Sequence, residues 1–324
     1  MNKFLKPLDY IFVLRPTSFF SVWTIFLAGF FVQNKFGVAA TPGSNGQLPI
    51  SNGQSDFLWV GLFLTLLIGA VFILNQIKDR PSGDSKDKLT LIGQEHLTPK
   101  FAFFQAIVLI VAAIGFGFFF SLNMGIVFLV ILIFVGILYN FKPFSWKDKP
   151  ILGLVTNILF AFLLFNGGWI IKGSLSTDLL IYALPYVCAA AAVYLYSTLP
   201  TAEEDQAQNK VTFGVKYGLK NTVFIGCALI LFSLCGAFYL NDELIFYPAF
   251  FSLPFFAWAA VKRRMEDIYR AISFPILLLT LTICIKYKIE INSLVYFFII
   301  IGLYFACKAY YRFRFGVDYP KLSV

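Results

Sequence analysis

The 324-residue chain has little charge, because only 13% of its residues are Asp, Glu, Lys or Arg while 59% are hydrophobic. Soluble domains carry about 25% charged and about 45–50% apolar residues. A chain this poor in charge lacks the polar surface that would cover it in water. Lipid is the solvent that fits, so the composition excludes an ordinary soluble domain.

Histidine and paired cysteines are also scarce. The single histidine, His96, lies in a polar loop, and the five cysteines all fall inside apolar runs without a Cys-x-x-Cys pair. No spacing among them is typical of zinc ligands or of a disulfide framework. We therefore interpret the cysteines as buried or lipid-facing side chains and give His96 no catalytic role.

Apolar runs long enough to cross a bilayer follow one another along the chain. A transmembrane helix needs roughly 20 mostly apolar residues, within a range of about 17–25. The last run is short for a span, so nine and ten helices are both consistent with the pattern. We predict one all-α membrane domain over residues 1–324, a bundle of nine to ten transmembrane helices. The predicted spans are 17–33, 57–77, 101–121, 124–140, 151–171, 179–199, 222–240, 245–261, 271–287 and 293–307.

The basic residues predict which side of the membrane each loop faces. All but four of the 26 Lys and Arg residues fall in segments on one side, the exceptions being Lys35, Lys172, Lys286 and Lys288. By the positive-inside rule, both termini then lie in the cytoplasm. We expect a multi-pass protein of the inner (plasma) membrane of a bacterium. The net charge of +9 reflects this topology, so the expected partner is the lipid bilayer and not nucleic acid.

The first of two acidic stretches follows the second predicted span on the cytoplasmic side. Asn75 and Asp79 are four residues apart, so they share one face at the end of that helix. Pro81 and Gly83 then break the helix. This break is expected to let Asp84 turn back toward Asp79.

The second acidic stretch follows the sixth predicted span and contains Thr201, Glu203, Asp205, Lys210 and Thr212. Mg²⁺ typically bridges one or two carboxylates to substrate phosphates, and nearby Lys and Arg neutralise diphosphate oxygens. Two carboxylate groups at the same depth therefore suggest a Mg²⁺–diphosphate site. The alternative interpretation is ordinary solvated loop charge.

These two stretches resemble the aspartate-rich motifs of the UbiA superfamily of membrane prenyltransferases. Asn75-x-x-x-Asp79 is similar to the first motif of that family, and Glu203-x-Asp205 followed by Lys210-Val211-Thr212 is similar to the second. Further similarities are spread in order along the chain. They include Arg15-Pro16, Tyr139-Asn140, Arg270-Ala271-Ile272 and the ending from Tyr310 to Pro320.

The sequence departs from the family pattern in both motifs, and in the second motif Glu204 and Asn209 also replace glycines of the pattern. Gly83 stands where the last aspartate of the first motif belongs, with Asp84 one place further on, and Thr201 replaces the leading aspartate of the second. A degenerate, non-catalytic lipid-binding member is therefore the alternative function. A transporter is less favoured because the spans contain almost no ionisable residues.

The resemblance implies an activity and a set of site residues. The activity is transfer of a prenyl group from a prenyl (allylic) diphosphate to an aromatic or other lipophilic acceptor, with Mg²⁺ as cofactor. The implied catalytic residues are Asp79 and Asp205, and the implied metal ligands are Asp79, Asp84, Glu203 and Asp205. The implied substrate contacts are Asn75, Arg80, Lys142, Lys147, Lys210, Thr212 and Arg264.

Overall fold

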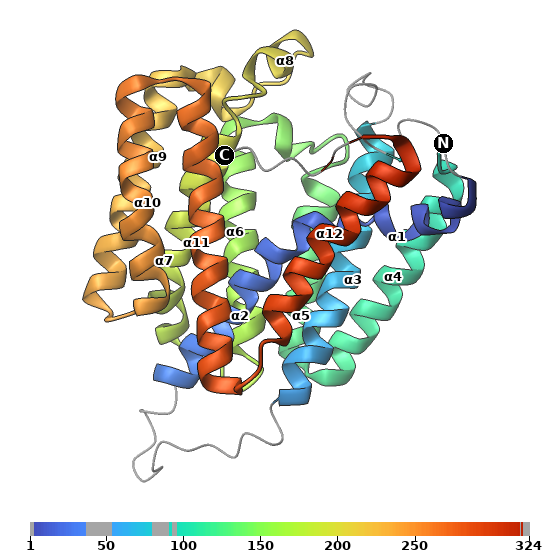
Figure 1. Cartoon of the computed structure of the whole chain (residues 1–324), viewed down its shortest axis with the longest axis horizontal. Helices are drawn as coiled ribbons and strands as arrows, with labels where there is room; N and C mark the ends of the chain where they lie inside the picture. The colour runs from blue at the N-terminus through green and yellow to red at the C-terminus, as the bar shows by residue number, and fades with distance from the viewer. Residues whose placement is uncertain (1–2, 37–53, 80–90, 93–95, 318, 320–324) are drawn as a thin grey trace. The chain divides into compact units, whose positions relative to one another are not determined.

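The computed structural model of the chain describes residues 3–36, 54–79, 91–92, 96–317 and 319, and the regular structure within them is helical (Figure 1). Nine helices among these residues are long and apolar enough to cross a membrane, and the shorter apolar segment Leu122–Leu138 accompanies them. The predicted all-α membrane fold of nine to ten helices is therefore confirmed.

The chain divides into two compact units, and each contains one of the acidic stretches. Unit 1 comprises Met1–Val22, Leu58–Phe144 and Asn292–Leu322, and unit 2 comprises Trp23–Phe57, Ser145–Ile291 and Ser323–Val324. The N-terminal segment and the C-terminal helix thus belong to the same unit. That all 324 residues act as one domain stays a prediction.

Unit 1 is built from the N-terminal segment, most of α3, the α4–α5 pair and the C-terminal helix. Its described elements are η1 (Lys3–Leu8), α1 (Asp9–Phe12), η2 (Pro16–Ser18), α3 (Gln54–Asp79), α4 (Pro99–Phe120), α5 (Leu122–Ile131), the π-helix η5 (Leu132–Leu138) and α12 (Val295–Phe315). The turn between α4 and α5 is fixed by Ser121, whose hydroxyl accepts a hydrogen bond of 3.1 Å from the Met124 amide. Such a cap satisfies a backbone donor that the first turn of a helix leaves unpaired.

The core of unit 1 joins the N-terminal segment to α3, α4 and α12. The Phe12 ring stacks on the Tyr310 ring at a centroid distance of 3.7 Å, almost parallel to it. Close packing of these side chains stabilises the unit through van der Waals contacts, since lipid tails leave no hydrophobic driving force between membrane helices. Other buried members of the cluster are Val13, Ala70, Ile73, Leu74, Leu91, Ile92, Leu97, Ala102, Ala106, Cys307 and Tyr311.

Unit 2 contains the remaining helices, of which α9, α10 and α11 lie side by side with α7 next to α9 and α11 (Figure 1). The amide of Leu244 donates to the carboxylate of Asp242 at 3.1 Å and so caps the start of α10. The elements of unit 2 are most of α2 (Phe19–Phe36), η6 (Trp146–Asp148), α6 (Pro150–Trp169), α7 (Thr177–Ser197), α8 (Ala202–Ala207), α9 (Phe213–Tyr239), α10 (Glu243–Lys262) and α11 (Met265–Ile291).

Helices α2 and α6 cross with their backbones in direct contact. A Cβ atom on Gly29 would lie 1.9 Å from the carbonyl oxygen of Phe165, and one on Gly168 would lie 1.8 Å from the carbonyl oxygen of Phe26. Each helix therefore presents a glycine to the backbone of the other. Small residues at crossings are the usual way in which membrane helices approach closely.

Several helices of the structure are longer than the apolar runs that predict them, and the differences are largest at three helices. Helix α9 begins at Phe213 and not at residue 222, α11 covers Met265–Ile291 and not 271–287, and α12 continues to Phe315 and not to 307. The added turns carry charged residues such as Lys216, Glu266 and Arg314. Hydropathy detects only the lipid-length apolar part, whereas backbone hydrogen bonding extends α11 and α12 beyond it. In α9 the added residues form a short first part that ends at Gly218.

Candidate functional site

The second acidic stretch lies in unit 2, between the end of α7 and the start of α9. Thr198 joins these two helix ends, because its hydroxyl donates to the Leu195 carbonyl at 2.7 Å and accepts from the Gly214 amide at 3.1 Å. Thr198 is buried. The intervening residues, with the short helix α8, therefore form a loop whose two ends are fixed together.

Within this loop, two hydroxyl groups hold the carboxylate of Asp205. Oδ2 of Asp205 accepts a hydrogen bond of 3.1 Å from Thr201 and one of 3.2 Å from Thr212. Asp205 is half-buried. Hydrogen bonds from neighbouring side chains orient a carboxylate for ligand binding. Of the predicted site residues, Asp205 and Thr212 are thus brought into contact.

Backbone hydrogen bonds connect the segments that contain the predicted basic residues Lys210 and Lys147. The Lys210 amide donates to the Asp205 carbonyl at 2.8 Å, and the following amide, of Val211, donates to the Asp148 carbonyl at 3.2 Å. Asp148 ends the short helix η6, which also contains Lys147. The backbone therefore ties the second acidic stretch to the segment that carries Lys147.

A glycine then interrupts helix α9 close to the loop. Gly218 has φ 74° and ψ 170°, outside the helical region, so α9 consists of a first short part and a second long part. Residues other than glycine rarely adopt such a positive φ. The first part, starting after Thr212, is therefore free to follow a direction of its own.

Two other predicted residues of unit 2 are exposed and have no structural link to Asp205 in the described contacts. Glu203 lies two residues before Asp205 on α8, and Arg264 lies in the turn between α10 and α11. Further along, the Arg270 guanidinium approaches the buried Asp267 carboxylate at 3.2 Å. The roles of Glu203 and Arg264 stay predictions.

The first acidic stretch lies in unit 1. Asn75 and Asp79 occupy the last turns of α3, both half-buried, with Asp79 as the final residue of the helix. Gln76 fixes this end of the helix, because its amide nitrogen donates to the Val13 carbonyl at 2.7 Å. Lys142 is exposed in the segment after η5.

Two predicted residues, Arg80 and Asp84, lie outside the described residues. The expected turn of Asp84 toward Asp79 therefore stays a prediction. The approach of Asp79 to Asp205 also stays a prediction, because these residues belong to different units.

The donor set fits a magnesium ion that takes part of its coordination from substrate. No three His, Cys, Asp or Glu side chains of the described part of the chain are grouped closely enough to hold a metal ion by themselves. Mg²⁺ does not require such a cage, since it commonly keeps one or two protein carboxylates and completes its shell with phosphate and water. An oriented carboxylate such as that of Asp205 is suited to this role.

Sequence reasoning missed the part that Thr201 plays beside Asp205. It counted Thr201 as a lost carboxylate, whereas the structure shows a hydroxyl donor to Asp205. The four-residue spacing, which places both side chains on one helical face, was the signal that could have found this contact. Thr198, which closes the loop, has no comparable signal because its partner Gly214 is 16 residues away.

The comparison with protein families identifies the chain. The model of the UbiA prenyltransferase family matches residues 22–274, which include both acidic stretches. The chain therefore belongs to the UbiA prenyltransferase family, as its motifs predict. No curated protein matches the chain.

Solved structures agree on the fold at low sequence identity. A UbiA homologue from Archaeoglobus fulgidus bound to DMAPP and Mg²⁺ has a TM-score of 0.61 and 16% identity, with 85% of this chain and 99% of that chain covered. A UbiA homologue from Archaeoglobus fulgidus bound to GPP and Mg²⁺ has a TM-score of 0.64 and 16% identity, with 91% of this chain and 99% of that chain covered. A structure of digeranylgeranylglyceryl phosphate synthase has a TM-score of 0.62 and 14% identity, with 86% and 97% covered. The chain thus spans almost the full length of these proteins.

Proposed function

We propose that this protein is a membrane prenyltransferase that uses Mg²⁺ to move a prenyl group from an allylic diphosphate to a lipophilic acceptor. The observation that carries the proposal is the Asp205 carboxylate, which two threonine hydroxyls orient in the second acidic stretch. Family membership supports it, as do structures of a similar protein bound to DMAPP or GPP with Mg²⁺.

Each acidic stretch has a proposed task at the cytoplasmic ends of the helices. Asp79 and Asp205 would provide carboxylate ligands, with Asp84 and Glu203 as further candidates, and Asn75 would orient Asp79 from one turn away. Lys142, Lys147, Lys210 and Arg264, together with Arg80, would contact the diphosphate oxygens. Thr212 acts through Asp205, to which it donates a hydrogen bond.

The proposed reaction requires stabilisation of the negative charge on the leaving diphosphate and of the positive charge on the allyl group. The C–O bond between the prenyl group and the diphosphate must break, and the electron pair leaves with the diphosphate oxygen. Bound Mg²⁺ would stabilise the negative charge that develops on the leaving group. The lysine and arginine side chains would add to this stabilisation, while aromatic faces of the bundle would shield the positive charge on the allyl group.

The decisive experiment measures pyrophosphate release by the purified full-length protein in lipid nanodiscs. Allylic diphosphates of increasing chain length are supplied with and without Mg²⁺, and each reaction is repeated with a panel of lipophilic acceptors. Asp79→Asn and Asp205→Asn should each abolish Mg²⁺-dependent release, since the amide keeps the shape of the side chain and removes its charge. Asp178→Asn, an exposed acid in the first turn of α7, is the matched control and should leave release unchanged.

The result also separates the enzyme from the non-catalytic alternative. Wild-type protein that binds prenyl diphosphates but releases no pyrophosphate with any chain length or acceptor would overturn the enzymatic proposal. A lipid-binding role would then explain the altered motifs.

A further inference from the structure

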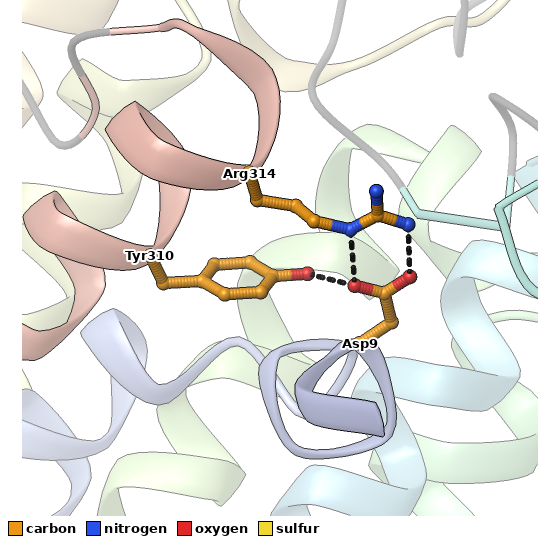
Figure 2. Close-up of polar contacts among 3 residues, drawn as sticks. All are labelled: Asp9, Tyr310 and Arg314. Atoms are coloured by element: carbon orange, nitrogen blue, oxygen red, sulfur yellow. Dashed lines mark hydrogen bonds and ion pairs between the residues drawn. The ribbon is translucent and has the colours of Figure 1, made fainter. Parts of the chain in front are cut away.

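A buried charged cluster joins the two ends of the chain in unit 1 (Figure 2). Asp9 is 0% exposed, Arg314 is 2% exposed and Tyr310 is 3% exposed. Oδ1 of Asp9 accepts from the Tyr310 hydroxyl at 2.7 Å and from Nε of Arg314 at 3.0 Å, while Oδ2 accepts from Nη2 of Arg314 at 2.9 Å. The guanidinium thus grips the carboxylate with two parallel bonds.

This geometry makes the cluster a fixed junction. Bidentate pairs between arginine and a carboxylate are strong and directional. A buried charge that loses its partner is strongly unfavourable, so neither side chain separates readily from the other. Tyr310 and Arg314 lie one turn apart on α12, so both point from the same face of that helix toward Asp9 of α1.

Two glutamine side chains hold the rest of the N-terminal segment. Gln76 of α3 donates to the Val13 carbonyl at 2.7 Å, and Gln105 of α4 donates to the Tyr10 carbonyl at 2.8 Å. The segment Lys3–Leu14, which we name the N-terminal clamp, therefore receives polar contacts from three membrane helices, α3, α4 and α12. None of these contacts belongs to the predicted diphosphate site.

The clamp leads from the buried ion pair to the first acidic stretch. Asp9 is four residues from Val13, and the Val13 amide donates to the Asp9 carbonyl at 2.9 Å, so the two form one helical turn. Val13 is in turn held by Gln76, which lies between Asn75 and Asp79 at the end of α3. A continuous set of hydrogen bonds therefore runs from Arg314 to the helix end that carries Asp79.

We propose that Asp9 and Arg314 are positioning residues, which fix the end of α3 through the N-terminal clamp. In the absence of the ion pair, Val13 would lose its fixed place and the last turns of α3 would open more often. The consequence for catalysis rests on the proposed function of Asn75 and Asp79. The conformational coupling does not, because it is measured without any substrate.

Amide hydrogen exchange of the full-length protein in nanodiscs tests the coupling. Arg314→Met introduces an unbranched apolar side chain in place of the guanidinium and so removes the ion pair. Exchange should then rise at least tenfold both in the clamp and at Ile73–Asp79. Gln76→Met should raise exchange at Ile73–Asp79 and next to Val13, the residue whose carbonyl it contacts, but not around Tyr310 and Arg314, because the ion pair between α1 and α12 stays intact.

A matched control comes from a second buried tyrosine–aspartate pair. The Tyr186 hydroxyl donates to Oδ2 of Asp242 at 2.8 Å in unit 2, and both side chains are buried. Tyr186→Phe should leave exchange at Ile73–Asp79 unchanged, whereas Tyr310→Phe should raise it. This comparison separates a general loss of stability from a loss of coupling.

Unchanged exchange at Ile73–Asp79 in Arg314→Met would overturn the proposal, whatever happens at α12. If Arg314→Met fails to fold, Arg314→Lys, which retains the charge but loses the two parallel bonds, gives the same comparison at a smaller effect. The failure of the proposed function would look different. Wild-type protein would then show no pyrophosphate release, while the exchange pattern of the variants would still show the coupling.

Discussion

The Thr201 hydroxyl donates a hydrogen bond of 3.1 Å to Oδ2 of Asp205, one helical turn further along the second acidic stretch. A threonine at this position, where the family motif has an aspartate, therefore donates to the Asp205 carboxylate and adds no negative charge beside it. At this position the second motif has a hydroxyl group that orients the Asp205 carboxylate, in place of a further carboxylate. Two of our predictions follow from this contact.

Removing the donors of Asp205 should weaken turnover without unfolding the protein. Thr201→Val and Thr212→Val keep the shape of the side chain and delete the hydroxyl, so each should lower Mg²⁺-dependent pyrophosphate release about 10–100-fold, as loss of a ligand's supporting partner commonly does. Thr282→Val is the control, because that hydroxyl donates to the Leu278 carbonyl of its own helix, far along the chain from the second acidic stretch. Steady-state rates across a Mg²⁺ titration provide the measurement, and equal rates in all three variants would refute the supporting role.

Thr201→Asp should make the stability of the protein depend more strongly on Mg²⁺. The new carboxylate would remove the donor and place a second negative charge beside Asp205, and like charges at this distance repel each other. A bound cation relieves the repulsion and stabilises the folded state by mass action. Thermal unfolding should therefore show a lower Tm than wild type without Mg²⁺ and a larger rise when Mg²⁺ is added. A rise equal to that of wild type would contradict the prediction.

Much of the fold could be predicted from the sequence, because membrane helices follow from apolar length. The described acids of the two stretches lie at helix ends as predicted, since Asp79 ends α3 and Asp205 follows α7. Their residue types and spacing indicated the family, which the family model confirms. These features depend on local sequence, which is where pattern reasoning is strong.

The contacts that hold each unit together could not be predicted in this way. Gly29 and Gly168 lie in apolar runs, and nothing in the sequence around them indicates the close contact between the backbones of α2 and α6. Asp9 and Arg314 are separated by 305 positions, so no local pattern links them. Side-chain pairing at such distances depends on how helices pack, which hydropathy does not encode.

The crossing of α2 and α6 should not tolerate a methyl group. Gly29→Ala or Gly168→Ala would place a Cβ atom within 2 Å of a backbone carbonyl oxygen. A change of side-chain rotamer cannot relieve this clash, because the contacting atom belongs to the backbone. We expect each to lower the free energy of unfolding by at least about 2 kcal/mol. Gly302→Ala in α12, where a Cβ would meet nothing within 4 Å, should change it little. Equal effects at all three sites, measured by unfolding in mixed detergent micelles, would argue against this crossing.

Stability should fall as the pH drops below about 6.5, the usual pKa of histidine. Burial and then the nearby Arg314 charge lower the pKa of His96, while Asp9 acts in the opposite direction. The folded chain then holds fewer protons than the unfolded chain below pH 6.5, so protonation favours unfolding and the stabilisation is lost as the pH falls through the lowered pKa. His96→Gln should flatten the dependence of Tm on pH between about 7 and 5.5. An unchanged slope would show that other groups cause it.

Labelling of introduced cysteines should confirm the orientation. Leu175, between α6 and α7, and Val211, before α9, are exposed residues outside the helices. By the positive-inside rule, Leu175→Cys should react with a membrane-impermeant maleimide in intact cells, whereas Val211→Cys should react only after permeabilisation. The wild-type chain, with its five native cysteines, sets the background. Reaction of both variants in intact cells would refute the ten-span orientation.

The buried pair of Asp9 and Arg314 also sets an order of events during synthesis. Asp9 is translated near the beginning, but its arginine follows 305 residues later. At about 5–20 residues per second, the carboxylate waits roughly 15–60 s for its partner. The packing of unit 1 is therefore completed only after α12 has been synthesised. A chain truncated before Tyr310 would lack both side-chain partners of Asp9.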